Sequence, residues 1–556
     1  MSEYDIIIFG GGISGLTLAH ELVKRDFKIL IVEKDSDFGG MARSRIEDNS
    51  IPSEHSWRGY APFYKNTFQL MKEIPYYDTT VYDNLSIPIE FYLLYDKIKD
   101  YKPRTTIKDK IIIISLGINY LLSGSRRDYY YAYDIEPFFK KYLSRDGYDF
   151  IINYVAGMGY GLNKREVSLG HVFHFSSIQY AHIGRHSHNH DIDQDEYEHT
   201  SDEWHVMTGP TNEVWIDPWR KELESKGVEF MNNAELIQLH YENNSIISAE
   251  VKQPDSTILL KSTDYVMATN PYNNVSIFEN SNMTKLQNDF KLLTDTTKSK
   301  QISFRMALGK DISYPINNIG FMLPDSEFNI TWYPQEKHWT LKPNVKSLWS
   351  GTIVDFETKG SLFNKNAEML TEDELKAEIT SQILRSNSFQ KLVYDSNDFH
   401  ITEDDIDFIE IWYEWKYIDG KQEQNNKKWV NNIYNEQYRM SQDTEYDNLF
   451  LSGAHTKTTT NLWTMEGAIE SGKITTNLIL DKYSKQKVEH YQHIDPLVII
   501  ILQQIDNGLY MLNLPPLLYV MIFIAILIIY AICKTIDVKK LQKLSKKLSK
   551  KLSQIT

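Results

Sequence analysis

The chain has 556 residues, 42% of them hydrophobic, so it is long enough to bury more than one hydrophobic core. Its net charge of −15 argues against nucleic acid as a partner, because most of the surface would repel phosphate. Cys533 is the only cysteine, which excludes a disulfide framework and a cysteine metal cluster.

A glycine-rich segment near the N-terminus predicts a dinucleotide site. Residues 5–9 form an apolar run, a helical pattern follows from Leu16 to Val23, and between them stands Gly10-Gly11-Gly12-Ile13-Ser14-Gly15. In this order of strand, turn and helix, Gly10 permits the tight turn, Gly12 lets the backbone approach a pyrophosphate, and Gly15 lets helix and strand pack closely. The predicted contacts are Gly10, Gly12, Ile13, Ser14 and Gly15.

Glu33 closes the second predicted strand, residues 28–33, and lies 18 residues beyond Gly15. At this spacing a carboxylate accepts hydrogen bonds from both hydroxyls of an adenosine ribose and repels a 2′-phosphate. Phosphorylated nicotinamide cofactors are therefore disfavoured. Lys34, which follows Glu33, is included among the predicted cofactor contacts.

A second glycine pair favours FAD over NAD. It stands in Gly39-Gly40-Met41-Ala42-Arg43-Ser44, where the cation three residues after Gly40 suits a diphosphate, and the contacts predicted here are Gly40, Met41 and Arg43. With this segment the sequence resembles the flavin amine oxidase and phytoene desaturase superfamily, in its desaturase-like branch. Members of that superfamily combine an N-terminal glycine fingerprint with this motif and a distant C-terminal flavin motif.

The C-terminal motif of that superfamily is also present. Residues 448–453 read as a buried strand ending at Gly453, and residues 463–472 read as a helix start. The resemblance implies that the backbone amides of Met465, Glu466 and Ala468 face the flavin pyrimidine ring, where a helix N-terminus would stabilise the anionic reduced flavin. No cysteine stands near this motif, so the sequence predicts FAD that is not bound covalently through sulfur.

A third matching segment runs from Trp215 through a helix to Lys226. By resemblance, Leu236 holds the adenine through its backbone, and the strand over residues 265–267 returns to the cofactor at Ala268. The predicted fold is α/β, with a Rossmann-like FAD-binding domain (1–75, 207–285, 440–485) interleaved with an α+β substrate domain (76–206, 286–439). An antiparallel sheet with helices on one face is expected in the substrate domain.

Two residues are candidates for catalysis. Glu54-His55-Ser56 resembles a segment that some desaturase-like members bring against the flavin ring, which would place Glu54 and His55 near the reactive flavin nitrogen. A capped turn with a satisfied histidine is the alternative. Amine oxidases usually carry an aromatic residue where this chain has Thr464, and the lysine they use aligns only loosely with Lys298 or Lys300.

The C-terminal region predicts a membrane anchor. Residues 514–533 carry no charge and are long enough to cross about 30 Å of hydrocarbon, while residues 496–512 suit an interfacial segment. Residues 534–556 carry eight lysines and one aspartate, as an amphipathic helix on anionic lipid or as a solvated tail. With no signal peptide before the glycine strand, we expect a single-pass anchor with the flavin domain in the cytosol, in a membrane that the sequence does not identify.

Six histidines between His182 and His205 lie in a polar, acidic segment that we interpret as a solvated insertion, so no metal is assigned. The sequence thus predicts a membrane-anchored FAD oxidoreductase that takes hydride from a C–H bond of a hydrophobic, isoprenoid or lipid-like substrate and passes electrons to oxygen or a quinone. One alternative is an amine oxidase that releases hydrogen peroxide. Another is a flavoprotein isomerase or scaffold.

Overall fold

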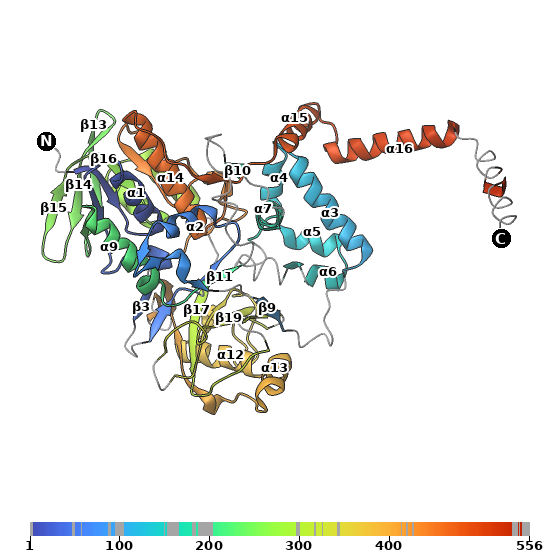
Figure 1. Cartoon of the computed structure of the whole chain (residues 1–556), viewed down its shortest axis with the longest axis horizontal. Helices are drawn as coiled ribbons and strands as arrows, with labels where there is room; N and C mark the ends of the chain where they lie inside the picture. Colours follow the sequence, from blue (N-terminus) through green and yellow to red (C-terminus); the bar gives the residue numbers. More distant parts are fainter. Residues whose placement is uncertain are drawn as a thin grey trace.

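The computed structural model of the chain describes residues 4–46, 51–56, 58–86, 90–94, 105–149, 151–152, 166–180, 185–186, 204–295, 301–315, 319–324, 326–341, 345–412, 414–418, 421–424, 427–535, 543 and 545–547. These residues form two large sheets, a layer of helices and one long helix that projects away from the rest (Figure 1). The N-terminal strand lies at the opposite side of the molecule from that helix (Figure 1).

The first sheet has five parallel strands in the order β12-β2-β1-β16-β24. Their bounds are Glu229–Met231, Ile29–Val32, Tyr4–Phe9, Ser262–Met267 and Leu449–Leu451. Strands β2 and β24 are buried along their whole length, because structure covers both faces of the sheet. All five strands come from the three segments predicted to form the FAD-binding domain, and the α/β Rossmann-like fold is confirmed.

The side chains of alternate residues of β1 point to opposite faces of this sheet. Ile6 and Ile8 pack under helices α1 (Ile13–Val23) and α14 (Met465–Lys482). Ile7 and Phe9 point to the other face and pack against a three-stranded sheet and two further helices. Those elements are β13 (Glu235–Glu242), β14 (Ser245–Lys252), β15 (Thr257–Leu260), α10 (Pro271–Asn280) and α11 (Thr284–Asp295).

The second sheet has six strands in the order β21-β17-β20-β19-β18-β9. Their bounds are Ile406–Ile411, Ile302–Leu308, Ser347–Ile353, Ile330–Pro334, Ile319–Leu323 and Glu90–Leu93. Helices α12 (Glu372–Leu384) and α13 (Asn387–Asn397) share its hydrophobic core. The strands pair antiparallel, as expected for the substrate domain, except that the edge strand β9 runs parallel to β18.

A layer of helices lies within residues 76–206, which the sequence assigned to the substrate domain. It comprises α3 (Ile107–Leu122), α4 (Arg127–Ala132), α5 (Ile135–Tyr142), α6 (Arg145–Asp149) and α7 (Leu169–Tyr180). Its buried residues, Tyr120 and Phe139 among them, join the core of the first sheet and not that of the second. Residues 107–149 therefore pack with the first sheet, although the sequence assigned them to the substrate domain.

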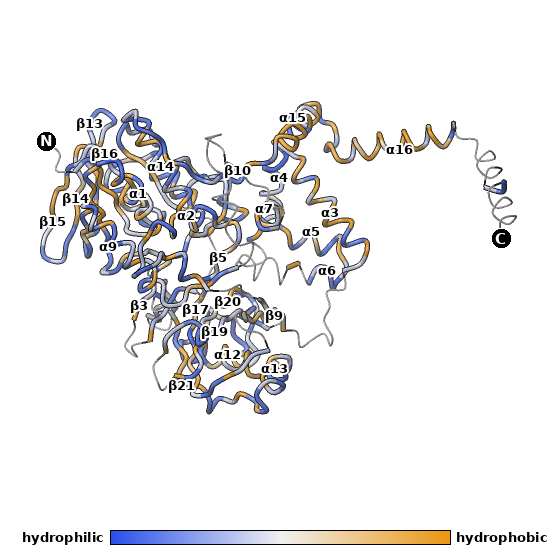
Figure 2. Tube along the Cα trace, viewed as in Figure 1, coloured by the Kyte–Doolittle hydropathy of each residue, from blue (hydrophilic) through white to orange (hydrophobic). Residues whose placement is uncertain are grey.

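Two helices end the described chain. Helix α15 (Leu497–Met511) packs on α3, and α16 (Leu517–Thr535) leaves the body and is apolar along its length (Figure 2). Over Leu517–Lys534 the mean hydropathy is 2.6 and 6% of the residues are buried, so this helix is long and apolar enough to cross a membrane. Most of the lysine-rich tail lies outside the described residues.

Shorter elements connect these layers. They include α2 (Lys65–Lys72), α9 (Asp217–Ser225), β3 (Ser44–Ile46), β4 (Pro52–Glu54), β5 (Gly59–Tyr60), β6 (Pro75–Tyr76), β7 (Thr79–Thr80), β8 (Leu85–Ser86), β10 (Arg185–His186), β11 (His205–Met207), β22 (Trp415–Ile418), β23 (Lys421–Gln424) and β25 (Tyr491–Gln492). Strand β4 leads directly into His55, and β11 pairs with both β5 and β8.

Candidate active site

A cavity of about 830 Å³ opens at the carboxyl ends of the parallel strands, where α/β sheets usually bind their ligands. It extends to the second sheet and to α7, since Thr331, Thr352 and Phe175 also line it. The predicted cofactor residues on its wall are Gly10, Gly12, Ile13, Ser14, Glu33, Lys34, Gly40, Met41, Arg43, Leu236, Ala268, Gly453, Met465 and Ala468. The three motif segments, distant in sequence, therefore meet around one cavity.

The glycine turn has room for a pyrophosphate. A Cβ on Gly12 would meet nothing closer than the Gly40 Cα, at 3.7 Å, because this side of the turn faces the cavity. Gly12 precedes α1 and offers no capping side chain, so the first amides of the helix remain available for an anion. Gly15 does not line the cavity: its Cβ would lie 2.1 Å from the Gly10 carbonyl oxygen, and its role is the predicted close packing of helix and turn.

Glu33 lies where the adenosine ribose is expected. Its Oε2 accepts a hydrogen bond from the Gly11 amide at 2.8 Å, and its Oε1 accepts one from the Asp35 amide at 3.0 Å. Each carboxylate oxygen keeps a second lone pair for a ribose hydroxyl. Burial raises the pKa of Glu33, while these two amides oppose that rise. The residues present therefore fit a dinucleotide with an unmodified ribose.

The N-terminus of α14 points at the other end of the cavity. Thr464 caps this helix through its Oγ1, which accepts from the Gly467 amide at 3.2 Å, and Met465 and Ala468 lie on the cavity wall. The helix dipole places positive potential where the flavin pyrimidine is predicted. The Glu466 side chain turns away and is fully buried among residues of α2. Its backbone amide stays a predicted flavin contact.

Glu466 joins α14 to α2 through four accepted hydrogen bonds. Oε1 accepts from the Asn66 amide and side chain at 3.0 and 2.7 Å, and Oε2 accepts from the Thr67 amide and hydroxyl at 2.9 and 2.8 Å. We expect Glu466→Ala to lower the free energy of unfolding by about 3 kcal/mol, because buried donors lose their acceptor. Denaturant unfolding measures this loss. The matched control is Asp481→Ala, at an exposed position on the same helix, and equal effects of the two substitutions would refute the assignment.

Arg43 lies on the cavity wall between two carboxylates. Its Nη1 is 2.6 Å from Asp35 Oδ2, and its Nη2 is 2.9 Å from Glu414 Oε1. The guanidinium is therefore already paired on two sides. Its predicted role as the cation beside the diphosphate remains a prediction.

The two catalytic candidates point in different directions. Glu54 does not lie on the cavity wall: its Oε1 accepts from the Thr211 amide at 2.9 Å and from the Thr211 hydroxyl at 2.6 Å. His55 lies on the wall with 3% of its surface exposed, and its Nε2 has no partner among the described residues. Burial, reinforced by the positive charges of Lys428 and Arg58, lowers the pKa of His55 well below its usual value. At neutral pH it is an uncharged imidazole.

Lys428 is a cavity residue that the sequence analysis missed. Its ammonium donates to Gln301 Oε1 and lies 4.9 Å from the centre of the Trp463 ring. Burial, with a smaller effect of Arg58, lowers the pKa of Lys428 from 10.5 to about 7. The available signal was the Lys427-Lys428 pair before Trp429 in an acidic chain. Lys298 and Lys300, considered from the sequence, lie outside the described residues.

Known proteins resemble this chain locally in sequence and widely in fold. Residues 8–74 match the NAD(P)-binding Rossmann-like domain family model. The oxidoreductase PigB of a Serratia species is 54% identical over 41 residues, which is 7% of this chain and 6% of PigB. A putrescine oxidase with putrescine bound is 12% identical, with 86% of this chain and 99% of that one covered and a TM-score of 0.57. Cyclohexylamine oxidase from Brevibacterium oxydans is 12% identical, with 87% of this chain and 100% of that one covered and a TM-score of 0.55.

The chain shares the overall fold of these two amine oxidases. At these identities the likeness to solved structures concerns the fold alone. The arrangement of the motifs agrees with this fold, since the N-terminal glycines and the start of α14 lie on one cavity.

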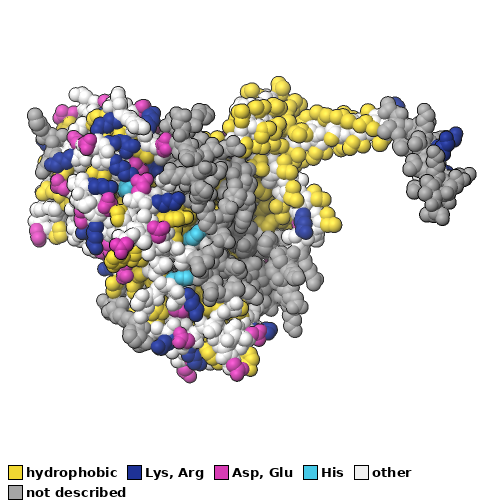
Figure 3. All heavy atoms as spheres, viewed as in Figure 1, with side chains coloured by type: hydrophobic (Ala, Val, Ile, Leu, Met, Phe, Trp, Pro, Cys, Tyr) yellow, Lys and Arg dark blue, Asp and Glu magenta, His cyan; other side chains and the backbone are white. Residues whose placement is uncertain are grey.

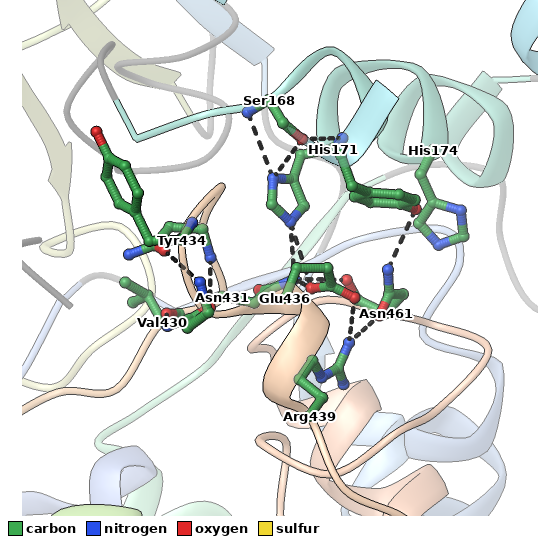
Figure 4. A network of polar contacts seen from close by, with 12 residues as sticks. Ser168, His171, His174, Val430, Asn431, Tyr434, Glu436, Arg439 and Asn461 are labelled. Atoms are coloured by element: carbon green, nitrogen blue, oxygen red, sulfur yellow. Dashed lines mark hydrogen bonds and ion pairs between the residues drawn. The ribbon is translucent and has the colours of Figure 1, made fainter. Parts of the chain in front are cut away.

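A polar network fixes the loop that carries Lys428 and Trp429 (Figure 4). Glu436 lies 3.5 Å from His171 of α7 and accepts from Asn431 Nδ2 at 3.1 Å. Burial alone would raise the pKa of Glu436, but the Arg439 charge and the bond to His171 lower it to about 2. Asn431 also donates to the Asn461 carbonyl at 2.9 Å, which ties this loop to the segment following β24. The network thus holds the Lys428 loop against α7.

Most of the histidine-rich segment lies outside the described residues, so the predicted lack of a metal site there stays a prediction. Two of its histidines are described: His186 in β10, which pairs with β25, and His205 in β11. The others, His182, His188, His190 and His199, lie outside the described residues. Across the part of the chain that the structure covers, no group of three or more potential ligands could hold a metal ion.

Proposed function

We propose that this chain is a membrane-anchored FAD-dependent oxidoreductase that takes hydride from a C–H bond of an uncharged, hydrophobic substrate of the isoprenoid or lipid class. The observation that carries the proposal is the distribution of charge around the cavity. Where the predicted flavin ring lies, the wall combines His55, Arg58 and Lys428 with aromatic rings. The carboxylates among the described lining residues belong to Glu33, Asp35 and Glu235, at the adenosine end.

This distribution argues against a cationic substrate. A protonated amine placed beside the Arg58 guanidinium would find no carboxylate on that part of the described wall to act as its counter-ion and would be repelled. An uncharged hydrocarbon meets Trp429, Trp463 and Phe175 without that penalty. Amine oxidation is the second candidate, supported by the names of the putrescine and cyclohexylamine oxidases that share the fold.

The protein's own residues supply a proton acceptor and a shielded site. When bound, FAD supplies the hydride acceptor. Removal of a hydride and a proton from neighbouring carbons would create a double bond, and the Lys428 amine, neutral above about pH 7, can take that proton at Nζ. His55 offers a second neutral nitrogen on the same wall. Oxygen or a membrane quinone would then accept the electrons from the flavin.

The membrane part of the proposal rests on α16. Its exposed apolar surface would be costly in water and is favourable in hydrocarbon. Attachment to a bilayer would bring the cavity close to a lipid-dissolved substrate.

The first test is the visible absorption spectrum of the full-length protein in lipid nanodiscs, recorded anaerobically before and after substrates are added. Bleaching of the flavin bands by an isoprenoid panel supports the proposal. Bleaching by putrescine or cyclohexylamine, with peroxide formed on admitting air, would establish the amine oxidase instead. A flavin bleached by neither class would leave an isomerase or scaffold, and protein purified and reconstituted without any flavin would refute the cofactor.

A further inference from the structure

Helix α15 turns Gln503, Asp506 and Asn507 toward the protein. Asp506, which is fully buried, accepts from Arg126 Nε at 3.2 Å and from the Leu517 amide at 2.9 Å. Asn507 Oδ1 accepts from the Ser125 amide at 2.7 Å, and Gln503 donates to the Leu121 carbonyl at 2.9 Å. These contacts bind α15 to the turn between α3 and α4. They also fix the corner at which α16 begins.

The outward surface of α15 and α3 is consequently apolar. On α15 the exposed side chains include Leu497, Val498, Ile501 and Ile505, between 49% and 72% exposed, with Gln504 as a polar residue among them. On α3 the isoleucines at positions 107, 111, 114 and 118 are between 38% and 79% exposed. Their spacing of four, three and four residues places them in one stripe along the helix. This is the reverse of the pattern that a water-facing helix shows.

The two stripes are continuous with the candidate membrane helix. Helix α3 packs against both α15 and α16, and the hydrophobic side chains of the three helices form one surface (Figure 3). Soluble monomers rarely expose an apolar area of this extent, so something other than water covers it. We propose that the outward faces of α3 and α15 lie in one leaflet of the bilayer around the base of α16. The inference rests on the proposed membrane anchoring and adds a second, monotopic contact to it.

The edges of this surface have the residue types that suit a membrane interface. Lys108 and Lys110 are exposed in the first turn of α3 and can extend toward lipid phosphates. Tyr129 and Tyr510, whose hydroxyls are 2.7 Å apart, lie with Arg126 at the other end of α3. Tyrosine and basic residues are enriched at the level of the lipid headgroups. The apolar stripes of α3 and α15 suit the hydrocarbon of a leaflet, and the rim residues suit its headgroups. Helix α16 would hold both stripes against that leaflet.

Embedding these faces would place the cavity close to the lipid. Helix α7 packs between α3 and the cavity. The Phe173 ring of α7 lies 3.6 Å from the position of a Cβ on Gly117 of α3, and Phe175 of α7 lines the cavity. One helix therefore separates the proposed leaflet contact from the candidate active site.

The test uses full-length protein with one fluorescent, polarity-sensitive label on a cysteine, reconstituted in phosphatidylcholine vesicles with or without nitroxide-labelled lipids. The native Cys533 reports on the α16 anchor. Ile111→Cys in a Cys533→Ser background reports on α3, and Leu259→Cys in the same background is the matched control, at an exposed hydrophobic position on β15. We expect a blue-shifted emission and roughly twofold or stronger quenching at position 111, as for a face buried about 5–10 Å into the leaflet. The label at position 259 is expected to remain unquenched.

The outcomes separate this inference from the anchor itself. Quenching at Cys533 with position 111 behaving like position 259 would overturn the leaflet contact and leave the anchor standing. A label at position 111 that is blue-shifted but unquenched would mean that a second copy of the chain covers the surface, which also overturns it. Absence of quenching at both positions would remove the anchor as well.

Discussion

Gly12→Ala is expected to yield a folded protein that binds FAD more weakly. The added methyl group would stand 3.7 Å from its nearest neighbour, an ordinary contact, and Gly12 already has backbone angles that alanine adopts, with φ −78° and ψ 179°. The methyl would, however, occupy the side of the turn where the pyrophosphate must approach the backbone. We expect the dissociation constant for FAD to rise by at least about tenfold, equivalent to about 1.4 kcal/mol.

The measurement is the flavin-to-protein ratio after reconstitution, together with thermal unfolding of the flavin-free protein. Gly15→Ala is the control, because its Cβ would lie 2.1 Å from the Gly10 carbonyl oxygen and should destabilise the fold itself. A Gly12→Ala protein that retains FAD with wild-type affinity would contradict the placement of the pyrophosphate. Equal destabilisation of both variants would contradict the division of roles between the two glycines.

Lys428→Met is expected to keep the flavin and lose most of the catalytic rate. If the Lys428 amine takes the substrate proton, anaerobic flavin reduction should slow by about 10²–10⁴-fold. The wild-type rate should rise with pH through about 7, where Lys428 becomes neutral, and the variant should lack that rise. Lys427→Met, at the exposed neighbouring position, is the matched control. A Lys428→Met enzyme with the wild-type rate and pH profile would exclude the proposed role.

The same substitution should stabilise the flavin-free protein. The pKa of Lys428 is about 7 when folded and about 10.5 when free, so between these values the unfolded chain binds more protons than the folded one. Burial of this lysine therefore lowers the free energy of unfolding by its full amount below pH 7. This destabilisation decreases as the pH rises from 7 and disappears near 10.5. We expect Lys428→Met to raise the unfolding temperature most at pH 6 and least near pH 10, which thermal scans at several pH values can test.

The cofactor half of the site could be predicted because each of its requirements is local. A tight turn, a close backbone approach and a ribose acceptor demand Gly10, Gly12 and Glu33 at fixed spacing, and all three lie on the cavity wall. The chemical half depends on tertiary structure. Glu54 and His55 are neighbours in an extended segment, so their side chains face opposite ways, and only the packing decides which one reaches the cavity.

Two other features also depend on tertiary contacts that the sequence alone does not reveal. Lys428 becomes a cavity residue because its loop is held against α7 by contacts with His171, more than 250 residues away in sequence. The isoleucine stripe of α3 has the spacing of a core-facing helix, and the sequence does not state whether that stripe faces protein or lipid. In the structure, the contacts with His171 bring Lys428 to the cavity, and the isoleucine stripe of α3 is left exposed.

The order of strands in the parallel sheet also determines when the protein can mature. β1 is made more than 400 residues before β24, which completes its sheet, and before α14, which covers it. Until then the apolar surface of β1 and α1 has no final cover, and the flavin-facing turn of α14 does not exist. Nascent chains should therefore depend on chaperones until α14 has been made, and the predicted cofactor can be bound only after that point.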